Sequence, residues 1–296
     1  MFEDIVEHYP VTEHVFALPG APKAHLTVAV FAIILYLVLI NLYWKMLNHF
    51  QPAFFKAVDG EPMKQWEQAM LMVSTSMHLI GVGIALCILH LGSEPVGTLS
   101  LLFYPEKANV FYMPLEGYCC SYYLGYFVID FSNYIYMQDS SPLGRQTMAH
   151  HVVVTAILVF ALTGGMCMPK LAAVAMICEI SQYFLNIRTI MGKQRWTGPY
   201  QFANNVAFFL AFTTFRIIFF PFLLRSHIQL ALYYNFDATG AVFRAFYYVN
   251  AVLFLFIVCL NFLWYYLVLK GFVRLVTTGS TVQEKPDSDD YEKQAE

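Results

Sequence analysis

Long stretches of hydrophobic residues recur along the chain and are separated by short polar segments. Between Val28 and Ile40, for example, every residue is hydrophobic. A bilayer core roughly 30 Å thick is crossed by about 20 such residues in a helix. The pattern therefore predicts an all-α membrane protein with about seven transmembrane helices. The predicted spans are 25–45, 67–91, 114–138, 146–166, 169–191, 200–225 and 242–272.

Composition supports this fold class. Hydrophobic residues make up 58% of the chain and charged residues only 12%, whereas soluble domains carry about 25% charged residues. We therefore expect a multi-pass membrane protein whose partners are membrane lipids rather than nucleic acid.

The distribution of Lys and Arg predicts the orientation of the spans. Eleven of these residues fall in loops on one side, five fall on the other, and Arg216 lies within a span, which accounts for all 17. Cytosolic loops carry the excess of positive charge. The amino terminus is thus predicted to be lumenal or extracellular, with the first span as a retained anchor, and the carboxyl terminus to be cytosolic.

Two further features bear on the lumenal side and on the tail. Cys119, Cys120 and Cys167 would lie near the lumenal side, where one disulfide between the third span and the loop after the fourth could form. Residues 277–296 are rich in acidic side chains and poor in apolar ones, a composition typical of a disordered tail.

Titratable and amide side chains inside the spans are the candidate functional groups, because such groups are costly in hydrocarbon and are usually functional. At 1.5 Å per residue, five of them lie between about 6 and 18 Å from the cytosolic ends of their helices. A shared depth predicts one polar cluster in the cytosolic half of the bundle. Its members would be His78, Asp130, His150, His151 and Asn186.

Glu179 and Arg216 are predicted to lie deeper and to form a buried ion pair, since an unpaired charge there would be expensive. Several of these residues could instead have a purely structural role. The two histidines could anchor a helix near the interface, Asp130 could hold helices together, and Arg188 could reach the membrane surface. A metal site is a further alternative, but the chain has none of the close His-x-x-x-His or Glu-x-x-His spacings, so we expect no metal.

The region from about Gln65 to Leu275 resembles the TLC domain, which translocating-chain-associated proteins, ceramide synthases and small lipid-homeostasis proteins share. The residues that carry the resemblance are Trp66, Ser74, His78, Asp130, His150, His151, the segment Glu179–Arg188 with Asn186 and Arg188, Asn205 and Arg216. The Glu-x-Ser-x-x-Phe-x-Asn-x-Arg pattern is closer to the small TLC-domain proteins, because the acidic pair of the ceramide synthases is missing.

The resemblance implies six helices around an intramembrane chamber, with the first span packed outside. It divides the chain into residues 1–64 (lumenal segment, first span and cytosolic loop), 65–276 (TLC domain) and the tail. It also favours the endoplasmic reticulum over the plasma membrane, and it is compatible with a homo-oligomer.

Two functions follow from the resemblance. One is acyl transfer from acyl-CoA, as co-substrate, to a membrane lipid amine or alcohol. In that reading His150, His151 and Asp130 are catalytic, while His78, Glu179, Asn186, Arg188, Asn205 and Arg216 support structure or bind substrate. The other is a non-enzymatic lipid-sensing or lipid-handling regulator of phospholipid composition.

Overall fold

The computed structural model of the protein describes residues 21–50, 62–91, 114–137, 141–164, 167–193, 198–233 and 241–278. Within these ranges the chain forms seven helical runs, which confirms the all-α prediction. The runs are α3 (Ala21–Phe50), α5 (Pro62–Leu91), α7 (Pro114–Met137), α8 (Pro142–Gly164), α9 (Met168–Ala175) continued by the 3₁₀ turn η2 (Met176–Glu179) and α10 (Ile180–Lys193), α11 (Pro199–Ala211) continued by the π-helical η3 (Phe212–Phe219) and α12 (Phe220–Tyr233), and α13 (Ala241–Thr278).

Proline marks the starts of four helices, Pro62, Pro114, Pro142 and Pro199. Proline suits the first helical position, because its fixed φ matches the helix and its missing N–H would have no partner there. Gly198, directly before α11, has φ of 108°, a left-handed conformation that glycine adopts at little cost. The sequence thus encodes the sharp entry into α11 locally.

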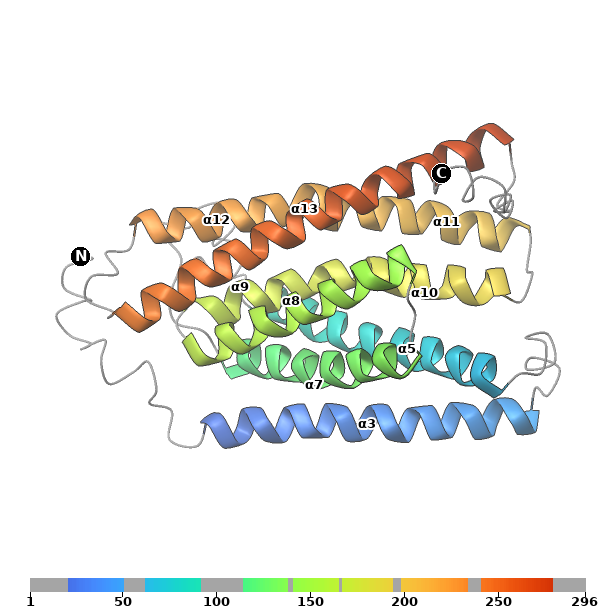
Figure 1. Ribbon diagram of the computed structural model, residues 1–296, viewed down its shortest axis with the longest axis horizontal. Coiled ribbons are helices and arrows are strands. Elements are labelled where there is room, and N and C mark those ends of the chain that lie inside the picture. The colour runs from blue at the N-terminus through green and yellow to red at the C-terminus, as the bar shows by residue number, and fades with distance from the viewer. Residues whose placement is uncertain are drawn as a thin grey trace, which may run out of the picture.

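Helix α3 lies at one edge of the bundle and α13 at the other, with α8, α9 and α10 between them (Figure 1). Five runs are long and apolar enough to cross a membrane, namely α3, α5, α8, α11–α12 and α13. The predicted spans at 114–138 and 169–191 are also helical but fall outside that group. The helices in these ranges, α7 and α9–α10, pack mainly against other helices, and all eight residues of α9 are buried.

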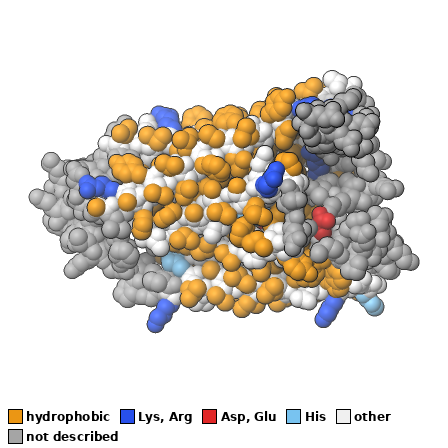
Figure 2. All heavy atoms as spheres, in the orientation of Figure 1, with side chains coloured by type: hydrophobic (Ala, Val, Ile, Leu, Met, Phe, Trp, Pro, Cys, Tyr) orange, Lys and Arg blue, Asp and Glu red, His pale blue; other side chains and the backbone are white. Residues whose placement is uncertain are grey.

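The outer surface matches a lipid environment. On the face drawn in Figure 2, hydrophobic side chains cover the middle, while Lys and Arg side chains lie mostly toward the two ends. Large apolar residues are exposed along α3 and α13, including Phe31, Val38, Phe256 and Leu263. A soluble protein rarely exposes so wide an apolar surface, so the arrangement supports a multi-pass membrane protein.

Helix α3 packs outside the other helices, against α7 and α5. The contact with α7 is close at Gly125, where an added Cβ would lie 2.2 Å from the carbonyl oxygen of Ala29. Small residues let membrane helices approach closely. A hydrogen bond from Asn133 Nδ2 to Tyr36 Oη, 2.9 Å long, also joins these helices.

The carboxyl-terminal helix and the buried cysteines differ from what the sequence predicted. Helix α13 continues through Thr278, two residues into the predicted tail, and residues 1–20 and 279–296 lie outside the described part of the chain. Cys119, Cys120 and Cys167 are buried free thiols, so the disulfide considered from the sequence does not form. Instead Cys120 Sγ donates to the carbonyl oxygen of Pro169 at 3.3 Å.

Candidate functional site

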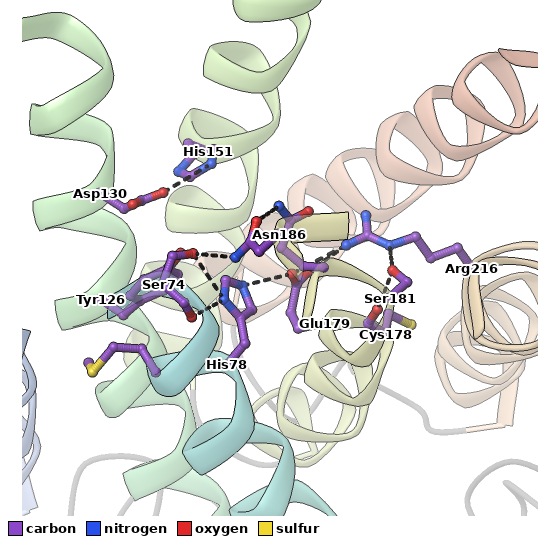
Figure 3. Close-up of polar contacts among 12 residues, drawn as sticks. Ser74, His78, Tyr126, Asp130, His151, Cys178, Glu179, Ser181, Asn186 and Arg216 are labelled. Carbon is purple, nitrogen blue, oxygen red and sulfur yellow. Dashed lines mark hydrogen bonds and ion pairs between the residues drawn. The ribbon is translucent and has the colours of Figure 1, made fainter. Parts of the chain in front are cut away.

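A connected group of polar side chains lies inside the bundle, where α5, α7, α8, η2, α10 and η3 meet (Figure 3). The sequence predicted two groups, a cytosolic cluster and a separate deeper ion pair. The structure joins His78 and Asn186 of the first group to the ion pair, whereas His151 and Asp130 form a pair of their own beside this network. The predicted residues that belong to it or border it are His78, Asp130, His150, His151, Glu179, Asn186 and Arg216.

The predicted ion pair between Glu179 and Arg216 is confirmed. Nη2 of Arg216 lies 3.2 Å from each oxygen of the Glu179 carboxylate. The guanidinium is held further by a 2.7 Å hydrogen bond from Nε to Ser181 Oγ and by a 3.4 Å bond from Nη1 to Asn261 Oδ1. Only 3% of Arg216 and 5% of Glu179 are exposed, so pairing offsets the cost of burying both charges.

His78 shares the same carboxylate. Its Nε2 lies 3.2 Å from Glu179 Oε2, and its Nδ1 lies 2.7 Å from the backbone carbonyl oxygen of Ser74. A carbonyl oxygen and an ionised carboxylate can only accept hydrogen bonds. Both ring nitrogens therefore face acceptors, and the Ser74 hydroxyl lies 3.3 Å from Nδ1 as well.

A chain of hydrogen bonds extends from His78's helix toward α7 and α10. Asn186 Nδ2 donates to Ser74 Oγ at 2.9 Å, and Ser74 Oγ lies 2.8 Å from Tyr126 Oη. Gln182 Nε2 in turn donates to Asn186 Oδ1 at 2.9 Å. These bonds fix α5, α7 and α10 relative to one another around the site.

His151 and Asp130 form a second pair. Nε2 of His151 lies 3.6 Å from Asp130 Oδ2, and both side chains are largely buried. The rings of Tyr134 and Phe127 pack beside His151, with centroid distances of 5.1 and 5.2 Å. His151 is thus held between aromatic rings with one nitrogen toward the carboxylate.

His150 points elsewhere, as expected for adjacent residues about 100° apart on a helix. Its ring lies 5.4 Å from that of Trp264 and 5.9 Å from that of His151. Its buried Nδ1 has no hydrogen-bond partner within the described part of the chain. His150 also lines an internal cavity of about 10 Å³ together with Glu179 and Arg216, which is about the space that one water molecule needs.

Comparison with known proteins identifies the domain. Residues 67–270 match the family model of the TLC domain. The chain belongs to the TLC-domain family. No curated protein and no solved structure shows significant similarity to the chain. The TLC-domain family is associated with lipid metabolism and homeostasis, and the buried polar network lies within the TLC domain of this chain.

Two of the predicted site residues, Arg188 and Asn205, lie apart from the polar network. The guanidinium of Arg188 lies 5.8 Å from the centroid of the Phe208 ring. Asn205 is buried on α11, and its Oδ1 has no hydrogen-bond partner among the described residues. The structure therefore does not bring Arg188 or Asn205 to the histidines.

Sequence reasoning missed three contributors to the TLC-domain site, Tyr126, Asn261 and Trp264. Tyr126 precedes Asp130 by four residues, so the two share a helix face, and this spacing could have indicated it. Asn261 is one of two amide side chains, with Asn250, in the apolar middle of α13, and such a residue could have been noted from the sequence. Trp264 stands among many aromatic residues, and only its hydrogen bond to Gln146, 2.9 Å long, distinguishes it.

The described part of the TLC domain contains no group of three His, Cys, Asp or Glu side chains placed to hold a metal ion. The network's carboxylates bind basic side chains instead.

Proposed function

We propose that the protein transfers the acyl group of a fatty acyl-CoA to an amine or alcohol group of a membrane lipid. The observation that carries this proposal is the environment of His150. Its ring lines a buried cavity with Glu179 and Arg216, and its Nδ1 meets no hydrogen-bond partner among the residues that the structure describes. An imidazole nitrogen without a partner is free to accept a proton from a substrate, and membership of the TLC family supports a lipid acceptor.

In the proposed reaction His150 is the general base. The acceptor's nitrogen or oxygen attacks the thioester carbonyl carbon while His150 takes its proton. A tetrahedral intermediate forms and collapses with cleavage of the C–S bond. The CoA thiolate then recovers the proton from the imidazolium, so the products are an amide or ester and free CoA.

We assign His151 and Asp130 a positioning role in this reaction. The Asp130 carboxylate holds His151 at 3.6 Å, and the ring of His151 packs 5.9 Å from that of His150. Fixing one imidazole beside the other limits the rotation of the base. A carboxylate also stabilises positive charge that develops on neighbouring rings.

The substrate must reach His150 through a conformational change. The cavity has space for about one water molecule, and it is lined by Phe220 on α12 and by Phe254 and Ile257 on α13. We propose that these helices separate from α8 to admit the thioester and the lipid. The chamber implied by the family resemblance would then form only when substrate binds.

Several partners follow from this proposal. The acyl-CoA would approach from the cytosolic side near Arg188, while the acceptor would enter from the bilayer. We propose the endoplasmic reticulum as the location, and a homo-oligomer remains compatible with the exposed apolar helices. Lys193 and Arg195, the next basic residues along the chain, would add positive charge there; the side chain of Lys193 and all of Arg195 lie outside the described residues.

A second candidate function is a non-enzymatic regulator of membrane lipids. The pairing of Glu179 with both Arg216 and His78 favours it, because such pairs also serve to hold helices together. In that case the cavity would sense or carry a lipid, and His150 would need no catalytic role.

A direct assay separates the two functions. Purified protein in lipid nanodiscs is supplied with a fatty acyl-CoA and with sphingoid bases or lysophospholipids, and released CoA thiol and acylated lipid are measured. We expect activity in the wild type and none in His150→Ala. His227→Ala is the matched control, since His227 is also buried with an unpartnered Nδ1 but lies on α12 and does not line the cavity.

Each result has a clear reading. Equal activity in the wild type and His150→Ala would exclude His150 as the base. If no acceptor is acylated by the wild type, yet cells expressing either protein show the same change in their lipids, the regulator is the better account.

A further inference from the structure

Arg216 has no part in the reaction as described, although it lines the same cavity as His150. A guanidinium beside a reacting carbonyl could do more than hold Glu179. Three features of Arg216 fit such a role. They are the hydrogen-bond donors that its partners leave unused, its fixed positive charge and its place on an irregular helical turn.

The first feature is the donor count. A guanidinium carries five N–H donors. Nε donates to Ser181, one N–H of Nη2 is shared between the two oxygens of Glu179, and Nη1 donates to Asn261, so these contacts use three donors. One N–H of Nη1 and one of Nη2 remain without an acceptor among the described residues. In Figure 3 one terminal nitrogen of Arg216 points away from both Glu179 and Ser181.

The second feature is the charge of the guanidinium itself. A guanidinium is a fixed positive charge in a protein, and Glu179 is shared between Arg216 and His78 rather than held by Arg216 alone. A fixed positive charge beside a buried cavity favours a negative charge that develops there.

The third feature is local backbone geometry. Arg216 lies on the π-helical run η3 and Glu179 on the 3₁₀ turn η2. Both departures from the α-helix occur at the ion pair itself, and π-helical turns are frequent at functional sites. Ser181 and Asn261 then fix the guanidinium from α10 and α13, so the remaining donors are held in defined directions.

We propose that Arg216 is a catalytic residue that stabilises the oxyanion of the tetrahedral intermediate. This inference rests on the acyl transfer proposed above. When the acceptor attacks, the electron pair of the carbonyl bond moves onto the oxygen, and a free N–H of Arg216 binds that oxygen. The pair returns as the C–S bond breaks. Arg216 gains and loses no proton, and Glu179, Ser181 and Asn261 are positioning residues.

The experiment compares Arg216→Lys, Ser181→Ala and the wild type in nanodiscs, with kcat, KM for acyl-CoA and the thermal unfolding midpoint measured for each. Arg216→Lys keeps a cation beside Glu179 but loses the planar fork. We expect kcat to fall about 10²–10³-fold, as for other lost oxyanion donors, while KM and the unfolding midpoint change little. Ser181→Ala removes one support of the guanidinium and should lower kcat by a smaller factor.

Arg225→Lys is the matched control, because Arg225 is exposed on α12 and should keep wild-type kinetics. If Arg216→Lys fails to fold, the fall in kcat without a rise in KM for Ser181→Ala carries the test. Wild-type kcat in both Arg216→Lys and Ser181→Ala would overturn the oxyanion role while leaving acyl transfer in place. A wild type that releases no CoA thiol would overturn the proposed function, and this inference with it.

Discussion

Arg216 contacts both carboxylate oxygens of Glu179 at 3.2 Å, although the two residues are 37 positions apart in the chain. The contact joins the η2 turn to the π-helical η3 in the middle of the bundle. Neither side chain has more than a few per cent of its surface exposed. Each charge therefore depends on the other, and this dependence can be measured.

The first prediction concerns this pair. Arg216→Leu should lower the free energy of unfolding by about 3–5 kcal/mol, because Glu179 would keep a buried charge with less compensation. Glu179→Leu added to Arg216→Leu should recover part of that loss. Chemical or thermal unfolding in detergent gives both values, and strictly additive losses would show that the two residues do not interact.

The second prediction concerns the contacts of His78 with Glu179 and with the carbonyl oxygen of Ser74. His78→Leu removes both contacts and should lower the free energy of unfolding by about 1–3 kcal/mol, because it leaves buried polar groups with fewer partners. Chemical unfolding in detergent measures the loss. An unchanged free energy of unfolding would contradict this prediction.

The third prediction tests how α3 is seated. Gly125→Ala places a Cβ 2.2 Å from the Ala29 carbonyl oxygen, so α3 must shift, and overpacking of this kind costs about 1–3 kcal/mol. Gly83→Ala is the matched control, since a Cβ on Gly83 meets nothing within 4 Å. The unfolding midpoint should fall only for Gly125→Ala. Equal midpoints would mean that α3 does not pack closely on α7.

The helices could be predicted from the sequence because bilayer thickness and apolar length limit the possibilities strongly. The Glu179–Arg216 pair followed from the cost of an unpaired charge. The link from His78 to Glu179 could not be predicted, since the depth estimate assumed straight α-helices at 1.5 Å per residue. The turns η2 and η3 change the rise and rotation at those two residues.

The sequence predicted that His150 and His151 point in different directions, but not which groups each ring contacts. Their 100° separation on the helix followed from the sequence, but the choice of which ring meets Asp130 depends on the rotation of α8 against α7. The role of Trp264 likewise depends on how α13 crosses α8. Such contacts are set by tertiary packing, which a single sequence does not specify.

The fourth prediction concerns orientation. The excess of Lys and Arg in alternate loops predicts a cytosolic carboxyl terminus. A protease added outside intact microsomes should therefore remove an epitope tag placed after Glu296. A tag at the amino terminus is the control and should be protected. Protection of the carboxyl-terminal tag would reverse the orientation and the proposed route for acyl-CoA.

The last prediction concerns Asp130 and His151, which lie 3.6 Å apart. Asp130→Asn keeps the shape of the side chain but removes the charge that orients and stabilises the histidines. We expect kcat to fall by about 10²–10⁴-fold, as is typical when acid–base assistance is lost, with little change in KM for acyl-CoA. Ser132→Ala, at an exposed position of α7, should have no effect.

The double variant Asp130→Asn with His151→Gln distinguishes positioning from a purely structural role. If Asp130 acts through His151, the double variant should be about as slow as the slower single variant, because residues that act as a unit are not additive. A structural role would instead lower the folded fraction in each variant while leaving kcat per folded molecule unchanged. Multiplied losses in kcat would mean that Asp130 supports catalysis by a route that does not pass through His151.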